Sequence, residues 1–296
     1  PTAASDAPSA AAAPSPRPAR RAEIERPVFI VSPPRSGSSL LFETLSRSPT
    51  AYTIGGESHG LIEGVPALDA ARRGYESNRL VADDATPEVA AALRERFRDS
   101  AFDRERRPPA NERFRLLEKT PKNALRIPFL ARVFPDALFV YLYRDPRQVF
   151  ASMLEAWESG GFRTYPQLPG WSGPPWSLLL VPGWRELAGR PLPEIVAAQW
   201  RTTTEILLDD LQALAPERRF VARYDALVAD PAAEIARLCA AVGFDWDEPL
   251  GARLPLADHT VSAPHAEKWR RREADVVPML ARVGATVARA AAFAAR

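Results

Sequence analysis

Short apolar runs alternate with stretches of helical spacing along most of the chain. The runs typical of buried strands cover residues 28–31, 114–117, 138–143 and 220–224. Apolar positions recur at helical spacing in residues 38–45, 146–157, 194–214 and 232–242. Strands that alternate with helices pair in parallel and carry helices on both faces. We therefore predict an α/β fold, a single three-layer domain in which helices flank a central parallel β-sheet.

Two segments lack this alternation. Residues 1–22 are almost entirely Ala, Pro, Ser and Arg and have too little apolar surface to fold, so we predict a disordered Ala/Pro-rich linker at 1–26 and one domain at 27–296. Because the sequence begins at Pro1, the linker either joins this domain to a larger multidomain polypeptide or is the terminus of a standalone protein. Residues 160–193 are rich in Gly, Pro and Trp and predict a long surface loop.

Composition narrows the functional classes. With 46% hydrophobic residues in a chain of 296, a substantial core is expected and disorder throughout is excluded. The 39 basic and 37 acidic residues nearly cancel, which argues against nucleic-acid binding and suits a small anionic ligand. One cysteine, Cys239, and three histidines provide neither a disulfide nor metal-ligand spacing. No apolar run is long enough to span a membrane, so we expect a cytoplasmic protein.

A glycine-containing turn joins the first predicted strand to the first helix. Residues 32–39 read Ser-Pro-Pro-Arg-Ser-Gly-Ser-Ser. A loop that enters a helix N-terminus directs backbone N–H groups and the positive end of the helix dipole at one point, which favours a phosphate. Arg35 adds a cation, and Ser38 and Ser39 either bind the anion or cap the helix. The triphosphatase pattern G-x-x-x-x-G-K-[ST] is not matched, which disfavours magnesium-dependent phosphoryl transfer.

A second strand end carries Arg-Asp-Pro-Arg at residues 144–147. Pro146 suits the first position of a helix. Arg144 lies at the carboxyl end of its strand, where open α/β sheets bind ligands, and Ser152 lies about two helical turns further on. Both side chains are therefore expected to face one anion. Surface charges beside a capped helix are the alternative.

Together the two segments resemble the sulfotransferases that use 3′-phosphoadenosine 5′-phosphosulfate (PAPS). The first matches their 5′-phosphosulfate loop, in the form common to bacterial, carbohydrate and tyrosylprotein members, and the second matches their 3′-phosphate motif. The resemblance implies a P-loop-like fold, PAPS as donor, the 3′,5′-bisphosphate PAP as product, and no metal. It assigns the 5′ end of the donor to Arg35, Ser36, Gly37, Ser38 and Ser39, and the 3′-phosphate to Arg144 and Ser152.

Two later segments extend this resemblance over about residues 27–272. Residues 223–228 are similar to a segment whose tyrosine contacts the nucleotide, which implies that role for Tyr224; a half-buried strand-end tyrosine is the alternative. Residues 261–270 look like the loop that closes over the donor. This implies that Ser262 and Lys268 bind the donor and that Trp269 covers the adenine or anchors the loop. An exposed basic tail is the alternative.

The chain has only three lysines, at 119, 122 and 268, so a lysine that is kept marks either chance or a need for a compact ammonium. Related enzymes have a lysine near the bridging oxygen at the position of Lys119.

Cytosolic phenol and steroid sulfotransferases place a histidine base where this chain has Pro121, so the resemblance is closer to the tyrosylprotein and carbohydrate branch. In the tyrosylprotein branch a Gly-Glu segment supplies the catalytic glutamate, which matches Glu57. We prefer Glu57 as the base. In the alternative, His59 is the base and Glu57 orients it.

The expected activity is transfer of a sulfuryl group from PAPS to a hydroxyl or amine of a small-molecule or carrier-protein-bound acceptor. Two other classes stay open: a nucleotide kinase or triphosphatase with a degenerate P-loop, and a non-catalytic nucleotide-binding module. Six aromatic residues either form an apolar wall at the mouth of the site or hold a long loop in place: Trp157, Phe162, Tyr165, Trp171, Trp176 and Trp184.

Overall fold

The computed structural model of the chain describes residues 22–257 and 265–295. Its main sheet runs in the order β1 (Glu23–Ile24), β4 (Arg113–Lys119), β2 (Val28–Val31), β5 (Leu138–Tyr143) and β8 (Arg219–Arg223), and β3 (Ala51–Tyr52) also pairs with β4. Every pairing in this sheet is parallel, which confirms the predicted sheet. Because β1 lies within residues 1–26, the sheet begins before Pro27.

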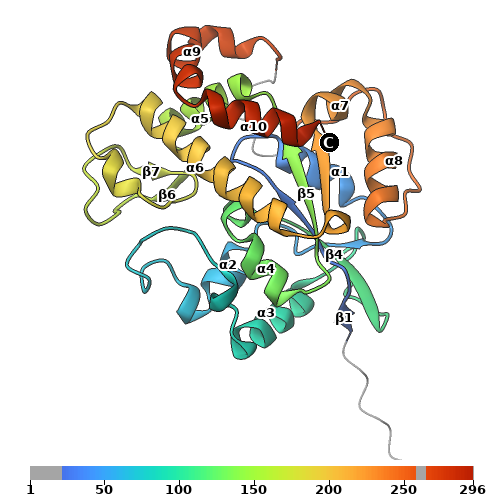
Figure 1. Cartoon of the computed structure of the whole chain (residues 1–296). Coiled ribbons are helices and arrows are strands. Elements are labelled where there is room, and N and C mark those ends of the chain that lie inside the picture. The colour runs from blue at the N-terminus through green and yellow to red at the C-terminus, as the bar shows by residue number, and fades with distance from the viewer. Residues whose placement is uncertain (1–21, 258–264, 296) are drawn as a thin grey trace, which may run out of the picture.

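Helices cover both faces of the sheet, so the three-layer prediction is also confirmed (Figure 1). Phe29 and Val31 of β2 face α3 (Pro87–Ser100), α4 (Ile127–Val133), α6 (Leu192–Ala213) and α10 (Gly284–Ala294). Val28 and Ile30 face α1 (Ser38–Leu45), α7 (Tyr224–Ala229) and α8 (Pro231–Val242). Burial on both faces explains why these strands read as continuous apolar runs rather than as alternating ones.

A third apolar cluster joins α5 (Pro146–Ser159), α9 (Glu273–Arg282) and the segment 160–193. This segment contains an antiparallel pair, β6 (Arg163–Tyr165) and β7 (Trp176–Ser177), and the 3₁₀ helix η4 (Trp184–Leu187). The prediction that this segment lies on the surface is therefore wrong, because Trp176 and Trp184 are 0% exposed and pack edge-to-face on each other. Trp157 and Trp171 contact Trp176 in the same way. The tryptophans thus hold the segment in place.

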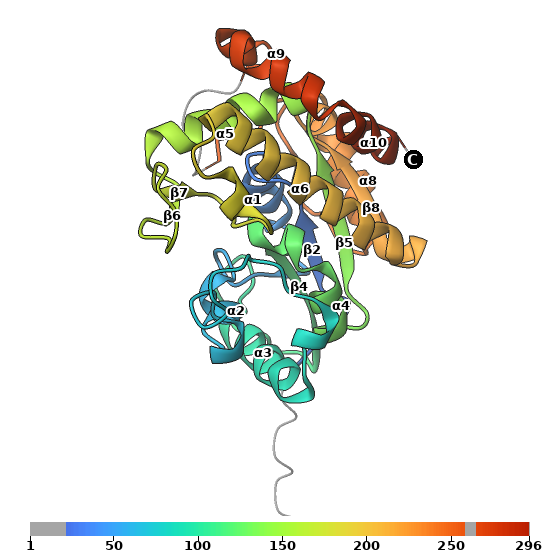
Figure 2. The ribbon, with the colours of Figure 1, turned by 60° about the vertical axis from the view of Figure 1, so that its left-hand side comes forward.

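The remaining elements are short, and several of them connect the sheet to its helices. They are α2 (His59–Glu63) and the 3₁₀ helices η1 (Pro66–Leu68), η2 (Ala82–Asp84), η3 (Pro121–Leu125), η5 (Pro216–Arg218) and η6 (Lys268–Arg272). In Figure 2, α2 and α3 form the lower end of the molecule, and β6 and β7 project beside α5. Within the described residues no single helix is long and apolar enough to cross a membrane; only the pair 268–282 and 284–294, bent by 85°, passes that test jointly.

The sheet order places four connections at one edge. Parallel strands end together, so the segments that leave β2, β4, β5 and β8 meet at their carboxyl ends. These segments are the loop before α1, the turn into η3, the turn into α5 and the start of α7. All four carry residues that the sequence singled out.

Candidate active site

A cavity of about 770 Å³ lies at this edge of the sheet. Its volume is typical of a site for a drug-sized or nucleotide-sized ligand. The predicted site residues that line it are Arg35, Gly37, Ser38, Ser39, Glu57, His59, Arg144, Ser152, Tyr224, Lys268 and Trp269. Ser36 and Lys119 are not among the lining residues, and Ser262 lies outside the described residues.

The loop before α1 depends on two left-handed backbone positions. Arg35 has φ 68°, a conformation that costs a non-glycine residue about 1–2 kcal/mol and that clusters at functional sites. Gly37 has φ 95°, and a Cβ there would lie 2.5 Å from ring carbons of Tyr224, so only glycine fits. The Ser36 hydroxyl donates to the Pro33 carbonyl at 2.8 Å and closes the loop. The side chain of Ser36 is therefore structural.

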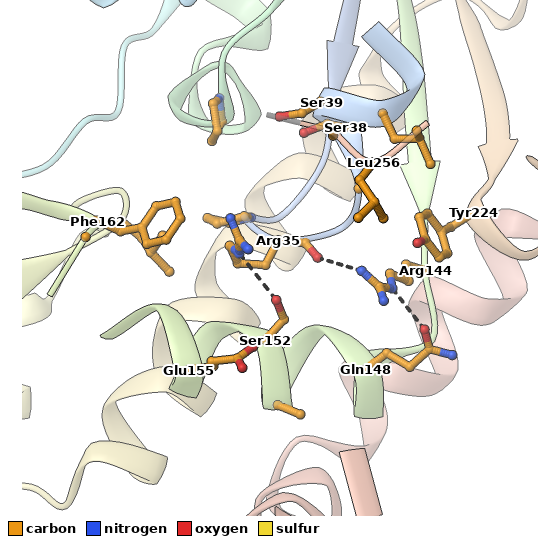
Figure 3. Close-up of a pocket in the computed structure, with 18 of the residues that line it drawn as sticks. Arg35, Ser38, Ser39, Arg144, Gln148, Ser152, Glu155, Phe162, Tyr224 and Leu256 are labelled. Atoms are coloured by element: carbon orange, nitrogen blue, oxygen red, sulfur yellow. Dashed lines mark hydrogen bonds between the residues drawn. The ribbon is translucent and has the colours of Figure 1, made fainter. Parts of the chain in front are cut away.

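Two partly buried arginines meet beneath this loop (Figure 3). Arg35 Nε donates to Ser152 Oγ at 3.3 Å, and Arg144 Nη1 donates to the Arg35 carbonyl at 3.3 Å. Arg144 Nε donates to Gln148 Oε1 at 3.0 Å. Burial lowers the pKa of Arg35 and of Arg144. At Arg35, Glu155 opposes this effect and the charge of Arg144 adds to it. Two desolvated cations at the start of two helices form a site for an anion with more than one negative charge.

One end of the cavity is apolar. The Tyr224 ring lies 4.1 Å beneath the Arg144 guanidinium. Leu256 and Val228 line the cavity nearby and are 63% and 44% exposed, which is unusual for large aliphatic side chains. Figure 3 shows Leu256 and Tyr224 at this end and Phe162 at the other, with Arg35 between them. The sequence prediction did not include Gln148, Val228 or Leu256.

A carboxylate, an ammonium and an imidazole form the next group. Glu57 Oε1 accepts from Lys119 Nζ at 2.8 Å, and Glu57 Oε2 bonds His59 Nε2 at 2.6 Å. Lys119 Nζ also donates to Ser39 Oγ at 3.2 Å, so Lys119 lies directly behind two lining residues. Burial alone would raise the pKa of Glu57, but the contacts with His59 and Lys119 outweigh it and lower the pKa to about 2.

A buried hydrogen-bond network fixes this group against the end of β4. Glu118 is fully buried and accepts from Thr120 Oγ1 and, at 2.7 Å, from Asn123 Nδ2. Thr120 Oγ1 in turn accepts from the Ser58 backbone N–H at 2.7 Å. Burial raises the pKa of Glu118, opposed by these hydrogen bonds. Ser58 is the residue between Glu57 and His59, so the network sets the position of both. A glutamate inside an apolar strand was the available sequence signal for it.

The C-terminal segment is attached to α5 beside the arginines. Lys268 Nζ pairs with Glu155 Oε2 at 2.7 Å, and Arg272 Nη1 donates to Glu158 Oε1 at 2.8 Å. Trp269 is buried and packs in the third apolar cluster while it lines the cavity, so of its two predicted roles the anchoring one agrees with its packing. Lys268 and Trp269 thus join the same site as Arg35.

The opposite end of the cavity combines apolar and basic groups. Its lining consists of Pro121, Lys122, Phe162, Arg163, Thr164, Leu178 and Leu179. The Phe162 ring lies 4.4 Å from the Arg35 guanidinium. Of the six aromatic residues expected either as a wall or as loop anchors, only Phe162 lines the cavity. We call this part of the cavity the Phe162 end.

Known proteins similar to this chain are found among solved structures. No curated protein matches the chain. Solved structures similar to it include the sulfotransferase domain of the Synechococcus PCC 7002 olefin synthase, at 20% identity and TM-score 0.47 over 90% of this chain and 96% of that one. Sulfotransferase STF9 from Mycobacterium avium matches at 18% identity and TM-score 0.45 over 88% and 69%. Mouse SULT7A1 in complex with PAP matches at 14% identity and TM-score 0.38 over 77% and 63%.

These structural similarities are too low to assign a donor or an acceptor. The sulfotransferase family profile matches residues 27–248, which include the loop before α1, the Glu57 group, the start of α5 and Tyr224. On this match the chain belongs to the sulfotransferase family.

Proposed function

We propose that the protein transfers the sulfuryl group of PAPS to a hydroxyl or amine of a small-molecule or carrier-bound acceptor. The observation that carries the proposal is the cavity that Arg35 and Arg144 share. A hydrogen bond joins the two residues, and Arg35 also contacts Ser152 while Arg144 contacts Gln148. PAPS carries phosphates at both ends of its ribose, and two separate cationic positions suit it better than a nucleotide with one phosphate chain.

The observed groups offer a partner for each part of the donor. Nη2 of Arg144 donates to no described residue, so the partly buried guanidinium keeps a donor for the 3′-phosphate. The N-terminal N–H groups of α1, with Ser38 and Ser39, receive the 5′-phosphosulfate. Tyr224, Val228 and Leu256 supply apolar surface for the base.

The chemistry requires charge stabilisation at the group that moves. The bond between sulfur and the bridging phosphate oxygen breaks, the bond between sulfur and the acceptor oxygen or nitrogen forms, and PAP leaves with the electron pair. Lys119, next to Ser39, stabilises the charge that develops on the leaving phosphate. Arg35 and Lys268 stabilise the sulfuryl oxygens, for which Lys268 exchanges its contact with Glu155 for the donor.

The acceptor proton goes to the Glu57–His59 pair. The sequence alone favours Glu57, but a carboxylate with a pKa of about 2 and with both oxygens occupied is a poor base near neutral pH. The contacts instead favour His59 as base, with Glu57 as its orienting partner. Among the described residues nothing partners the buried Nδ1 of His59, and an acceptor hydroxyl would supply that partner.

The test is incubation with PAPS and candidate acceptors, followed by measurement of released PAP and of the sulfated product. We expect PAP to bind and product to form only with an acceptor. Failure to bind PAP at millimolar concentration contradicts the proposal. Tight binding of magnesium ATP without PAP binding would favour the kinase or triphosphatase class. Binding of PAP without turnover on any acceptor would favour a non-catalytic nucleotide module.

A further inference from the structure

A second group of buried charges lies beside Glu57, and the proposed chemistry does not use it. Lys122 and Arg126 are 5% and 1% exposed, and both bind the carboxylate of Glu63. Lys122 Nζ donates to both Glu63 oxygens at 2.8 and 2.9 Å, and Arg126 Nη2 donates to Oε1 at 2.6 Å. Two cations share one carboxylate, so this cluster has one positive charge in excess.

An uncompensated buried charge is unfavourable, and the local contacts only reduce the cost. The Tyr165 ring lies 5.2 Å from Lys122 Nζ and offers a weak cation–π contact. Burial lowers the pKa of Lys122, an effect that Glu63 opposes. Arg126 Nη1 is buried and has no hydrogen-bond acceptor among the described residues. Within the cluster, the carboxylate of Glu63 thus balances only one of the two cations.

The cluster opens to the Phe162 end of the cavity through Lys122. Lys122 lines the cavity together with Glu57, His59 and Pro121, whereas Arg126 and Glu63 lie behind it. Glu57 is close enough to raise the pKa of Lys122, which places the ammonium near the reacting centre. Arg163 of β6 is exposed and lines the same end, which adds a second cation. Phe162, Leu178 and Leu179 provide the apolar surface between these polar groups.

We propose that the natural acceptor carries a carboxylate in addition to its hydroxyl or amine, and that Lys122, with Arg163 at the mouth, binds this carboxylate. The inference rests on the proposed sulfotransferase function and names the substrate class of that site. A single negative charge balances the excess of the cluster, whereas a dianionic phosphate would exceed it. The acceptor class is therefore a hydroxy or amino acid with an apolar body that lies against Phe162.

The test compares acids with their neutral amides on protein saturated with PAP. The probes are 4-hydroxyphenylacetate with 4-hydroxyphenylacetamide, and 3-hydroxyoctanoate with its amide, measured by calorimetry or by ligand-observed NMR. At least one acid should bind about tenfold or more tightly than its amide, because a hydrogen bond to a charged group exceeds one to a neutral group by that order. If neither acid binds more tightly than its amide, the proposal is wrong.

Two variants of the same cluster give effects of opposite sign. Lys122→Gln should lower acid affinity about tenfold and remove the preference over the amide. Glu63→Gln removes the internal competitor and should raise acid affinity, while amide binding changes in neither variant. Because both side chains are buried, circular dichroism and PAP binding verify that each variant is folded. Arg163→Gln, at an exposed position, should weaken acid binding without any effect on stability.

The outcomes separate the two proposals. Intact PAP binding with an acid preference that Lys122→Gln does not alter overturns the acceptor assignment alone. Sulfation of the amides at rates equal to or above those of the acids overturns it as well. Failure of PAP to bind overturns the sulfotransferase proposal, and an acid preference measured without PAP then reports on the cluster by itself.

Discussion

The Arg144→Ala variant tests whether the cavity recognises the 3′-phosphate of the nucleotide. The guanidinium is positioned by Gln148 and by the Arg35 carbonyl, at 3.0 and 3.3 Å, and rests on the Tyr224 ring. It is therefore held in place before any ligand binds, and little side-chain entropy is lost on binding. We expect the variant to bind PAP much more weakly and adenosine 5′-phosphate, which lacks the 3′-phosphate, only slightly more weakly.

The magnitude follows from the burial of this cation. Removal of one member of a buried, hydrogen-bonded charge pair costs about 2–5 kcal/mol. Since about 1.4 kcal/mol corresponds to tenfold in affinity, the Kd for PAP should rise by about 30-fold to several thousand-fold. Loss of a guanidinium–phosphate contact should also lower the salt dependence of PAP binding.

Titration calorimetry with PAP and with adenosine 5′-phosphate measures both effects on one sample. Arg289→Ala is the matched control, because Arg289 of α10 pairs with Asp209 of α6 and does not line the cavity. Its affinities should stay within about twofold of the parent protein. If Arg144→Ala weakens both nucleotides by the same factor, or leaves PAP binding unchanged, the assignment of the 3′-phosphate to Arg144 is wrong.

Three further predictions concern the loop, the reacting centre and the thiol. Gly37→Ala should lower the melting temperature and abolish PAP binding, because its Cβ would lie 2.5 Å from Tyr224 at a φ of 95°; a variant that binds PAP normally would contradict this. The pKa of Glu57 is lowered from 4.5 to about 2, so its charge contributes about 3 kcal/mol above pH 4.5, which is lost as pH falls towards 2. Urea unfolding of the parent and of Glu57→Gln should therefore converge in stability on acidification, and a constant difference would refute the contacts of Glu57 with His59 and Lys119. Burial raises the pKa of Cys239 to about 11, so iodoacetamide at pH 8 should modify it only on unfolding, as mass spectrometry would detect.

The sequence predicted those strands whose own residues form an apolar run. β2 and β5 are buried on both faces and bounded by turn residues, so a short apolar run identifies each of them. β1 and β3 have two residues each and exist because β4 pairs with them. No periodicity can be read from two residues, and a partner more than 60 positions away determines such strands.

The candidate site was predictable to the extent that strand ends meet at one edge of a parallel sheet. This rule brings Arg35, Lys119, Arg144 and Tyr224 together, as the structure confirms for their positions. The partners within the site were not predictable in the same way. Glu155 as partner of Lys268 depends on where the C-terminal segment packs on α5.

The segment 160–193 shows why a sequence pattern can mislead about burial. Glycine and proline remove the periodicity that identifies helices and strands, so the segment resembles a loop on the surface. Its position is determined by contacts among Trp157, Trp171, Trp176 and Trp184, which have no fixed spacing. Large aromatic side chains in such a segment therefore indicate a packed wall more than an exposed loop.

The Arg35 guanidinium contacts both halves of the cavity, with Ser152 on one side and the Phe162 ring on the other. A molecule that displaces Phe162 therefore also disturbs a cation that holds the nucleotide. Thermodynamic linkage then makes the effect mutual: by whatever factor one substrate alters the affinity of the other, the second alters the first equally. Donor and acceptor should accordingly bind with measurable cooperativity, and replacement of Phe162 by leucine should abolish this coupling while each substrate still binds by itself.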